Sequence, residues 1–299
     1  MYDIIGDIHG HANELKALLR KMDYQPVGDS FQHKTNKVVF VGDYIDRGPQ
    51  IPETLRIVKA MVDNGDAIAL MGNHEYNAIC YHTYNHSGEP LREHSPKNID
   101  QHKKTIEQFS GKNDLQKYID WFKTLPLFIE HDGFRVVHAC WNSDDIEFLS
   151  ATLGGNKLRH EHLIEAHSVN TRLFNALEVT LKGKEMKLPD GHKFLDKDKH
   201  VRNSIRIRWW EDGTNTTFKA YSILEDVVLP DMPVTLDGPS GFYQPSDKPV
   251  FFGHYWLTSQ PRLYRENICC LDYSVAKGGK LVAYRYQGES LLTSSGFCW

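Results

Sequence analysis

The stretch MYDIIGDIHG, residues 1–10, sets the first constraint on the fold. Its apolar first half predicts a buried strand, and an acid and an imidazole, Asp7 and His9, follow directly between two glycines. Residues two apart on an extended segment lie on the same face, so both side chains can reach one ion. The glycines permit tight turns and close approach of the backbone. The stretch therefore predicts a strand whose carboxyl end presents metal ligands.

Two further apolar runs repeat this pattern. KVVFVGD (37–43) ends on Asp43, and DAIALMGNHE (66–75) ends on Asn73, His74 and Glu75. The segments between the three runs, 11–22 and 51–65, have apolar residues at helical spacing. Strand, helix, strand, helix, strand is typical of parallel βαβ units, so we expect an α/β fold.

The pattern becomes irregular after residue 76 and returns later. FIEHDGFRVVHA (128–139) predicts a hairpin that turns on Asp132 and Gly133, and 248–255, 267–273 and 280–286 predict short strands. The polar, histidine-rich segment 77–130 and the irregular segment 141–248 predict cap-like insertions. We expect a single domain over residues 1–299.

Five of the apolar runs end on residues that can bind metal. They are Asp7 and His9, Asp43, Asn73, His138 and His254. Any one of them alone is explained as a helix cap, a turn former or a core histidine, but that does not explain their recurrence at five strand ends. Oxygen and imidazole ligands without thiolate favour Mn, Fe or Zn. A carboxylate such as Asp43 can bridge two ions, and two ions suit displacement at phosphorus.

Composition excludes several other classes of protein. The 299 residues carry a net charge of −4 and no polybasic tract, which argues against a stable nucleic-acid partner. No apolar run approaches the ~20 residues that span a bilayer, so we expect no membrane partner. The five cysteines form no CxxC pair, and the first residues lack a secretory pattern. We expect a cytoplasmic protein with free thiols.

GDIHG (6–10), GDYIDRG (42–48) and GNHE (72–75), in this order, resemble the signature of the calcineurin-like metallophosphoesterases. Within that superfamily they resemble the phosphoprotein phosphatase branch, which includes bacterial symmetrical diadenosine tetraphosphatases. His138 and His254 extend the resemblance to about residue 255. Two later blocks differ from the family, because they read His138-Ala139-Cys140 and Gly253-His254-Tyr255-Trp256.

The resemblance implies a four-layer α/β/β/α sandwich of two mixed sheets with an inserted cap. It also implies two divalent ions, Mn first with Fe or Zn as alternatives, held by the six residues above, with Asp43 bridging. His74 matches a general acid, Asp46 its orienting partner, and Arg47 a phosphate-binding arginine. The family supplies a second arginine from mid-chain, for which Arg206 and Arg208 are the candidates.

The implied reaction is phosphoester hydrolysis by in-line attack of metal-bound hydroxide. We place phosphomonoesters first as substrates, including phosphoserine, phosphothreonine or phosphotyrosine on a protein. The alternative is hydrolysis of dinucleoside polyphosphates such as diadenosine tetraphosphate. A phosphate-binding module without catalysis is a third class, but it predicts a missing ligand or acid, and every matching position is present here.

Overall fold

A computed structural model describes residues 1–109, 111–167, 169–195, 200–224, 227–235 and 241–299. Its first sheet has five strands in the order β17-β16-β1-β4-β5. They are β17 (Phe297–Cys298), β16 (Ala283–Tyr286), β1 (Tyr2–Ile5), β4 (Lys37–Phe40) and β5 (Ala67–Ala69). Strands β1, β4 and β5 run parallel, whereas β16 runs antiparallel to β1, so the sheet is mixed.

Helices make the crossovers between the parallel strands. Helix α1 (Ala12–Lys21) and the hairpin of β2 (Gln25–Val27) and β3 (Ser30–Gln32) lead from β1 to β4. Helix α2 (Ile51–Asp63) leads from β4 to β5 and packs against β3, β5 and α1. Both helices bury one face, as their apolar spacing predicts. The βαβ units expected over residues 2–75 are therefore present.

The second sheet contains the later ligand-bearing strands. Its order is β13-β12-β7-β6, from β13 (Ile268–Cys270), β12 (Val250–Phe252), β7 (Arg135–Val137) and β6 (Phe128–Glu130). Strand β12 runs parallel to β7 and β13, and β6 pairs antiparallel with β7. The predicted hairpin at 128–139 is confirmed, since Glu130 pairs with Arg135 across the expected turn.

Aromatic side chains join the two mixed sheets. The ring of Phe251 in β12 lies 5.3 Å from that of Tyr284 in β16, and Phe134 lies 5.0 Å from Tyr286. These residues are buried and belong to an apolar cluster that includes residues from Ile4 to Leu292. The α/β class with two mixed sheets is thus confirmed, and the arrangement in four complete layers stays a prediction.

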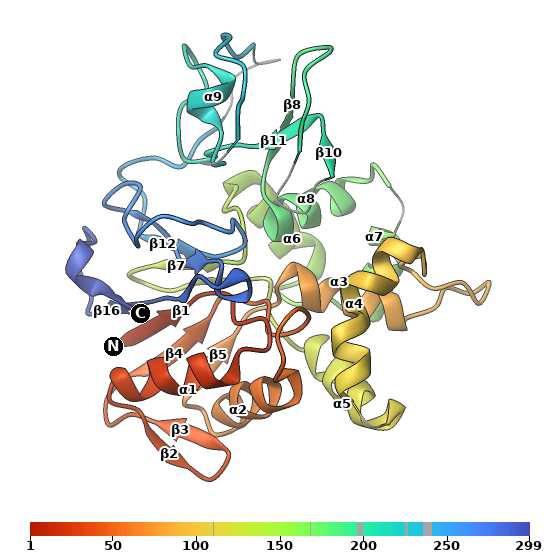
Figure 1. Ribbon diagram of the computed structural model, residues 1–299, viewed down its shortest axis with the longest axis vertical. Helices are drawn as coiled ribbons and strands as arrows, with labels where there is room; N and C mark the ends of the chain where they lie inside the picture. The colour runs from red at the N-terminus through yellow and green to blue at the C-terminus, as the bar shows by residue number, and fades with distance from the viewer. Residues whose placement is uncertain (110, 168, 196–199, 225–226, 236–240) are drawn as a thin grey trace.

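The remaining segments stand beside and above the sheets (Figure 1). Residues 73–122 form α3 (Asn73–His82), α4 (Pro96–Gln108) and α5 (Lys112–Phe122). Residues 143–182 form α6 (Ser143–Leu153), α7 (His160–Ala166) and α8 (Arg172–Lys182). The side chains of Asn142 and Thr171 cap α6 and α8, each accepting a backbone N–H three residues on.

An arm of short elements follows α8. It contains β8 (Glu185–Lys187), β9 (Phe194–Leu195), β10 (Val201–Arg202), β11 (Ser204–Arg206) and α9 (Phe218–Tyr221). A small apolar cluster of Leu188, Ile205, Ile207, Phe218, Tyr221 and Leu229 holds the arm together. Between β11 and α9, Trp209 and Trp210 are buried and pack on Phe252 in β12.

Strands β14 (Asp272–Tyr273) and β15 (Lys280–Leu281) pair antiparallel with each other. Among the described residues, every helix is too short or too polar to cross a bilayer.

Candidate active site

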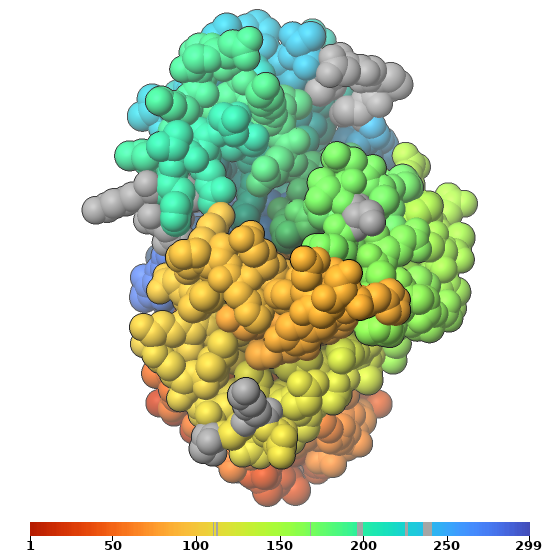
Figure 2. Space-filling view, turned by 90° about the vertical axis from the view of Figure 1, so that its right-hand side faces the viewer, coloured from red at the N-terminus to blue at the C-terminus, as the bar shows by residue number. Residues whose placement is uncertain are grey.

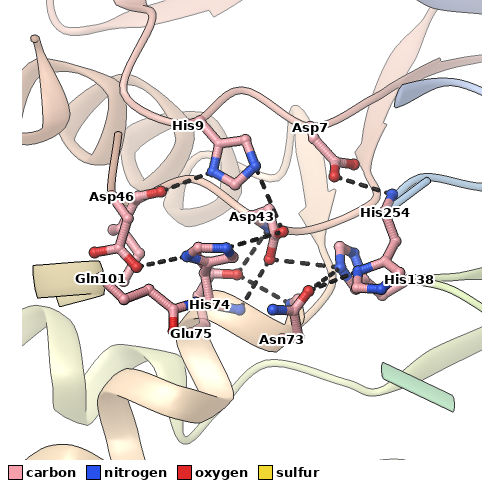
Figure 3. Close-up of polar contacts among 12 residues, drawn as sticks. Asp7, His9, Asp43, Asp46, Asn73, His74, Glu75, Gln101, His138 and His254 are labelled. Atoms are coloured by element: carbon pink, nitrogen blue, oxygen red, sulfur yellow. Dashed lines mark hydrogen bonds and ion pairs between the residues drawn. The ribbon is translucent and has the colours of Figure 1, made fainter. Parts of the chain in front are cut away.

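The six predicted ligands converge at one place, although they come from both sheets (Figure 3). Asp7 and His9 follow β1, Asp43 follows β4, and Asn73 follows β5 at the first residue of α3. His138 follows β7 and His254 follows β12. All six residues are buried. Parallel strands bring ligands to one edge of each sheet, and the edges of the two sheets meet here, so residues up to 247 positions apart lie together.

Two groups of side chains could each hold an ion, and they share one carboxylate. One group is His9, Asp43 and His74, and the other is Asp43, His138 and His254; within each group the ligand atoms lie within 4.8 Å of one another. Asp43 Oδ2 is 3.6 Å from His9 Nε2, and Asp43 Oδ1 is 3.5 Å from His138 Nε2. Asp43 therefore belongs to both groups.

Asn73 and Asp7 complete the donor set. Asn73 Oδ1 lies 3.0 Å from His138 Nε2 and 2.7 Å from His254 Nδ1. The backbone N–H of His254 donates to Asp7 Oδ2 over 3.0 Å, which ties the end of β12 to the end of β1. All the predicted ligands therefore face one small volume.

Several of these atoms are oriented and left without a partner, as a metal site requires. His9 Nδ1 donates to the Ile45 carbonyl and His138 Nδ1 to the Val41 carbonyl, both over 2.9 Å. Each bond keeps Nδ1 as the donor and orients Nε2 toward Asp43. Asp7 Oδ1, His9 Nε2 and His254 Nε2 are buried without a hydrogen-bond partner. Unpaired buried polar atoms are costly unless a ligand satisfies them, so these residues fit divalent cations.

The electrostatics of the site also favour a cation. Burial, followed by repulsion from Asp272 and Asp43, raises the pKa of Asp7. Burial lowers the pKa of His9 to about 3, and burial together with Arg206 lowers that of His254. His9 and His254 are thus held in the neutral form that binds metal, whereas the attraction of Asp43 outweighs burial and raises the pKa of His138. The crowded carboxylates need positive charge, which a divalent ion supplies.

Glycines and residues with left-handed backbone conformation let the ligand-bearing loops approach one another closely. A Cβ on Gly72 would lie 2.2 Å from Asp43 Oδ1, and a Cβ on Gly253 would lie 1.9 Å from Asp7 Oδ1. His9, Asp43 and His254 themselves have φ values of 47°, 56° and 74°. Such strain in non-glycine residues concentrates at functional sites and needs support from the surroundings.

Glu75 supplies part of that support. Its carboxylate accepts the backbone N–H groups of Asp43, Tyr44 and Gly72 over 2.8, 2.8 and 3.0 Å. Burial, then repulsion from Asp43, raises the pKa of Glu75 to about 7. The glutamate therefore holds two ligand-bearing loops together.

His74 and Asp46 form a pair at the edge of the ligand cluster. His74 Nδ1 donates to Asp46 Oδ2 over 2.5 Å, and His74 Nε2 lies 3.9 Å from Asp43 Oδ2. Burial alone would lower the pKa of His74, but the carboxylates of Asp43 and Asp46 outweigh it and raise that pKa. A protonated imidazole beside the ligands can donate a proton to a leaving oxygen.

A cavity of about 570 Å³ opens over the ligands. Figure 2 shows the hollow between the arm above and the α3–α4 segment below. Asn73, His74 and His254 reach its wall, as do Arg47 and Arg206. The structure separates the two mid-chain candidates. Arg206 lines the cavity, whereas Arg208 lies outside its lining, and Arg208 Nε donates to the Ser222 carbonyl over 3.1 Å.

Other residues at the site were not identified from the sequence. Trp256 stacks on His9 at 5.2 Å, and the guanidinium of Arg47 lies 4.5 Å from the Trp256 ring centroid. Asp272 accepts the Trp256 N–H over 2.7 Å. His102 is buried and donates to Asp46. These contacts join distant segments, so no local pattern signals them.

Comparison with known proteins identifies the family. The profile of the calcineurin-like phosphoesterase family matches residues 2–218, and the chain therefore belongs to that family. It is a phosphoric ester hydrolase, and the family implies divalent metal ions at the ligand cluster. This agrees with the resemblance carried by the three glycine-containing blocks.

Two relatives and one solved structure show the range of similarity. The chain is 28% identical over 302 residues to a symmetrical bis(5'-nucleosyl)-tetraphosphatase of Vibrio parahaemolyticus, covering 97% of both. It is 33% identical over 150 residues to the asymmetrical bis(5'-nucleosyl)-tetraphosphatase PrpE of Bacillus subtilis, covering 48% of this chain and 59% of the relative. A cold-active protein tyrosine phosphatase of a Shewanella species is 16% identical, with a TM-score of 0.45, over 95% of this chain and 74% of that one.

Proposed function

We propose that this chain hydrolyses dinucleoside polyphosphates, and that Asp7, His9, Asp43, Asn73, His138 and His254 hold two divalent ions, Mn²⁺ in the active form. The single observation that carries the substrate class is the charge of the cavity. Its described lining includes seven Lys and Arg side chains but only two Glu, in a chain of net charge −4. Positive charge concentrated in a cleft favours a polyanion over a doubly charged monoester.

The size and the mixed character of the cavity support the same substrate. Pockets of ~300–1,000 Å³ hold drug-sized ligands, and this one measures about 570 Å³. Its lining also includes the apolar residues Phe174, Phe194, Ile223 and Leu224, which suit nucleoside ends. The full-length similarity to a symmetrical tetraphosphatase points the same way.

The ions, when bound, supply charge stabilisation and activate water at neutral pH. The chain's own residues bind and orient the substrate. Arg47, held against Trp256, and Arg206 from the arm reach the cavity from different segments and grip phosphate oxygens. His74, oriented by Asp46, donates a proton from Nε2 to the oxygen of the leaving nucleotide. The symmetrical cleavage of diadenosine tetraphosphate by water then releases two ADP molecules.

The sequence alone placed phosphomonoesters first and dinucleoside polyphosphates second. The cavity charge and the relatives support the second class, which we therefore propose, and the test below includes phosphomonoesters. We also propose that residues 1–299 form one domain with insertions at about 77–130 and 141–248, supported by the shared apolar cluster.

The test is a substrate panel with Mn²⁺-loaded protein. Diadenosine tetraphosphate, a phosphotyrosine peptide, a phosphoserine peptide and 4-nitrophenyl phosphate are compared by kcat/KM, with nucleotide products separated by chromatography. We expect the dinucleotide to be preferred and to yield ADP. A preferred phosphopeptide, or no turnover of the dinucleotide, would contradict the proposal, and AMP with ATP would contradict symmetrical cleavage.

A further inference from the structure

Helix α4 buries polar residues and leaves its isoleucines exposed. Its buried residues are His102 and Thr105, whereas Ile99 and Ile106 are 43% and 39% exposed. A helix docked by hydrophobic burial shows the opposite arrangement. The contacts of His102 and Thr105 therefore determine how α4 packs against the rest of the protein.

Both residues contact Asp46, the partner of His74. His102 Nδ1 donates to Asp46 Oδ1 over 2.9 Å, and the Thr105 hydroxyl donates to the same oxygen over 2.5 Å. The backbone N–H of Asp46 donates in return to Thr105 Oγ1 over 3.0 Å. The other oxygen, Oδ2, accepts from His74. Both oxygens of this buried carboxylate are thus occupied, one by α4 and one by His74.

The next residue on the same helix face holds the same loop. Gln108 Nε2 donates to the Gly48 carbonyl, and Gln108 Oε1 accepts the Ile51 N–H, both over 2.8 Å. Positions 102, 105 and 108 are three apart, so they follow one another along the helix surface. One face of α4 therefore holds residues 46–51 through a row of hydrogen bonds.

We propose that His102 and Thr105 are positioning residues for His74, acting through Asp46. Their two donated bonds hold the carboxylate in the orientation in which Oδ2 accepts from His74 Nδ1, so that Nε2 carries its proton toward the cavity. Asp46 has φ 64°, a conformation that needs outside support. Hydrogen bonds to a charged acceptor supply that support strongly. This inference rests on the general-acid role of His74 in the proposed function.

A further histidine extends the chain of contacts. His82 Nε2 lies 3.2 Å from His102 Nε2. Burial, then repulsion from His102, lowers the pKa of His82 to about 4, so His82 is neutral near pH 7. Because His102 donates to Asp46 from Nδ1, its other ring nitrogen, Nε2, faces His82. His82 thereby contacts the far side of the His102 ring and helps to orient it toward Asp46.

The first test is proton NMR of the Zn²⁺-loaded protein, since Zn²⁺ is diamagnetic. A short bond between His74 Nδ1–H and a carboxylate gives a far-downfield resonance, assigned by its loss in His74→Asn. We expect His102→Phe and Thr105→Val to move this resonance upfield. Two conservative substitutions should leave the resonance at its parental position. They are His102→Asn, which keeps an N–H near the position of Nδ1, and Thr105→Ser, which keeps the hydroxyl.

His94→Phe is the matched control within the same cluster. His94 stacks on Tyr81 at 3.8 Å and donates to the Tyr81 carbonyl, away from Asp46. The substitution His94→Phe should leave the resonance in place. A resonance unmoved in His102→Phe and in Thr105→Val, in folded protein, would overturn the inference.

The second test is the dependence of rate on the leaving group. The ratio of kcat for 4-nitrophenyl phosphate to kcat for phenyl phosphate rises when proton donation is impaired, because the poorer leaving group needs the proton more. We expect His102→Phe to raise the ratio by about tenfold, a typical effect of a supporting residue. A general folding defect would lower both rates equally and would contradict the inference.

The two levels of failure are distinguishable. An unchanged ratio in His74→Asn would reject the general-acid role and with it that part of the proposed function. A raised ratio in His74→Asn with an unchanged ratio and resonance in His102→Phe and Thr105→Val would reject only the role of α4. If the protein hydrolyses neither aryl phosphate, the NMR resonance of the His74 Nδ1–H alone tests the role of α4.

Discussion

Replacing Gly253 by alanine tests the contact between the end of β12 and the end of β1. The φ of Gly253 lies outside the left-handed region, so alanine meets no backbone strain there. Its Cβ would instead lie 1.9 Å from Asp7 Oδ1 and 2.9 Å from Val41 Cγ2. To restore an ordinary contact of 3.4 Å, the Asp7 oxygen must move by about 1.5 Å.

The displacement of the Asp7 oxygen sets the expected losses of stability and of turnover. Asp7 is buried, and the crowding should cost about 1–3 kcal/mol of stability, as overpacking does. Misplacing a reacting group by ~1 Å can cost roughly 10²-fold in rate. Gly253→Ala should therefore fold, bind less than two equivalents of metal and lose at least about 10²-fold in kcat.

The assay combines elemental analysis after dialysis against Mn²⁺, thermal denaturation and turnover of diadenosine tetraphosphate. Gly241→Ala is the matched control, because a Cβ there meets nothing within 4 Å and its φ is not left-handed. It should behave as the parent protein. A Gly253→Ala protein with two bound ions and unchanged turnover would refute the placement of Asp7 in the metal site.

Three further substitutions have expected outcomes. His74→Ala should keep its metal content and lose roughly 10²–10⁴-fold in turnover, measured by steady-state kinetics; unchanged turnover of an alkyl phosphate would reject the acid role. Asp43→Asn should lower metal content in elemental analysis, because the shared ligand loses its charge, and two retained equivalents would count against bridging. Arg206→Ala should raise KM for diadenosine tetraphosphate by about tenfold, the value of one charge-assisted hydrogen bond, whereas Arg208→Ala should not. Equal effects of the two arginine variants would contradict their separation by the cavity.

The ligand-bearing strand ends could be predicted because each is a local pattern. An apolar run followed by glycine and a metal-binding residue is visible in ten residues, and parallel strands bring such ends together. Helices α1 and α2 and the turn at Asp132 and Gly133 likewise follow from spacing and turn chemistry. The sequence even contains the caps Asn142 and Thr171, although the segment after residue 141 looked irregular.

The supporting contacts could not be predicted, because they depend on tertiary packing. His102 lies 56 residues from Asp46 in the chain, in a polar segment whose apolar residues turn outward. Arg206 and Arg208 are two apart and would share a face on a continuous strand. In the structure only Arg206 lines the cavity, whereas Arg208 Nε donates to the Ser222 carbonyl.

The central claim is that residues from two sheets hold a pair of ions with Asp43 between them. Crystals grown with Mn²⁺ and measured near the manganese absorption edge test it most directly. We predict two anomalous peaks about 3.5–4 Å apart, one beside His9 and one beside His138 and His254, both within bonding distance of Asp43. A lone peak away from Asp43, or none at these residues in crystals of protein that hydrolyses diadenosine tetraphosphate, would contradict the account.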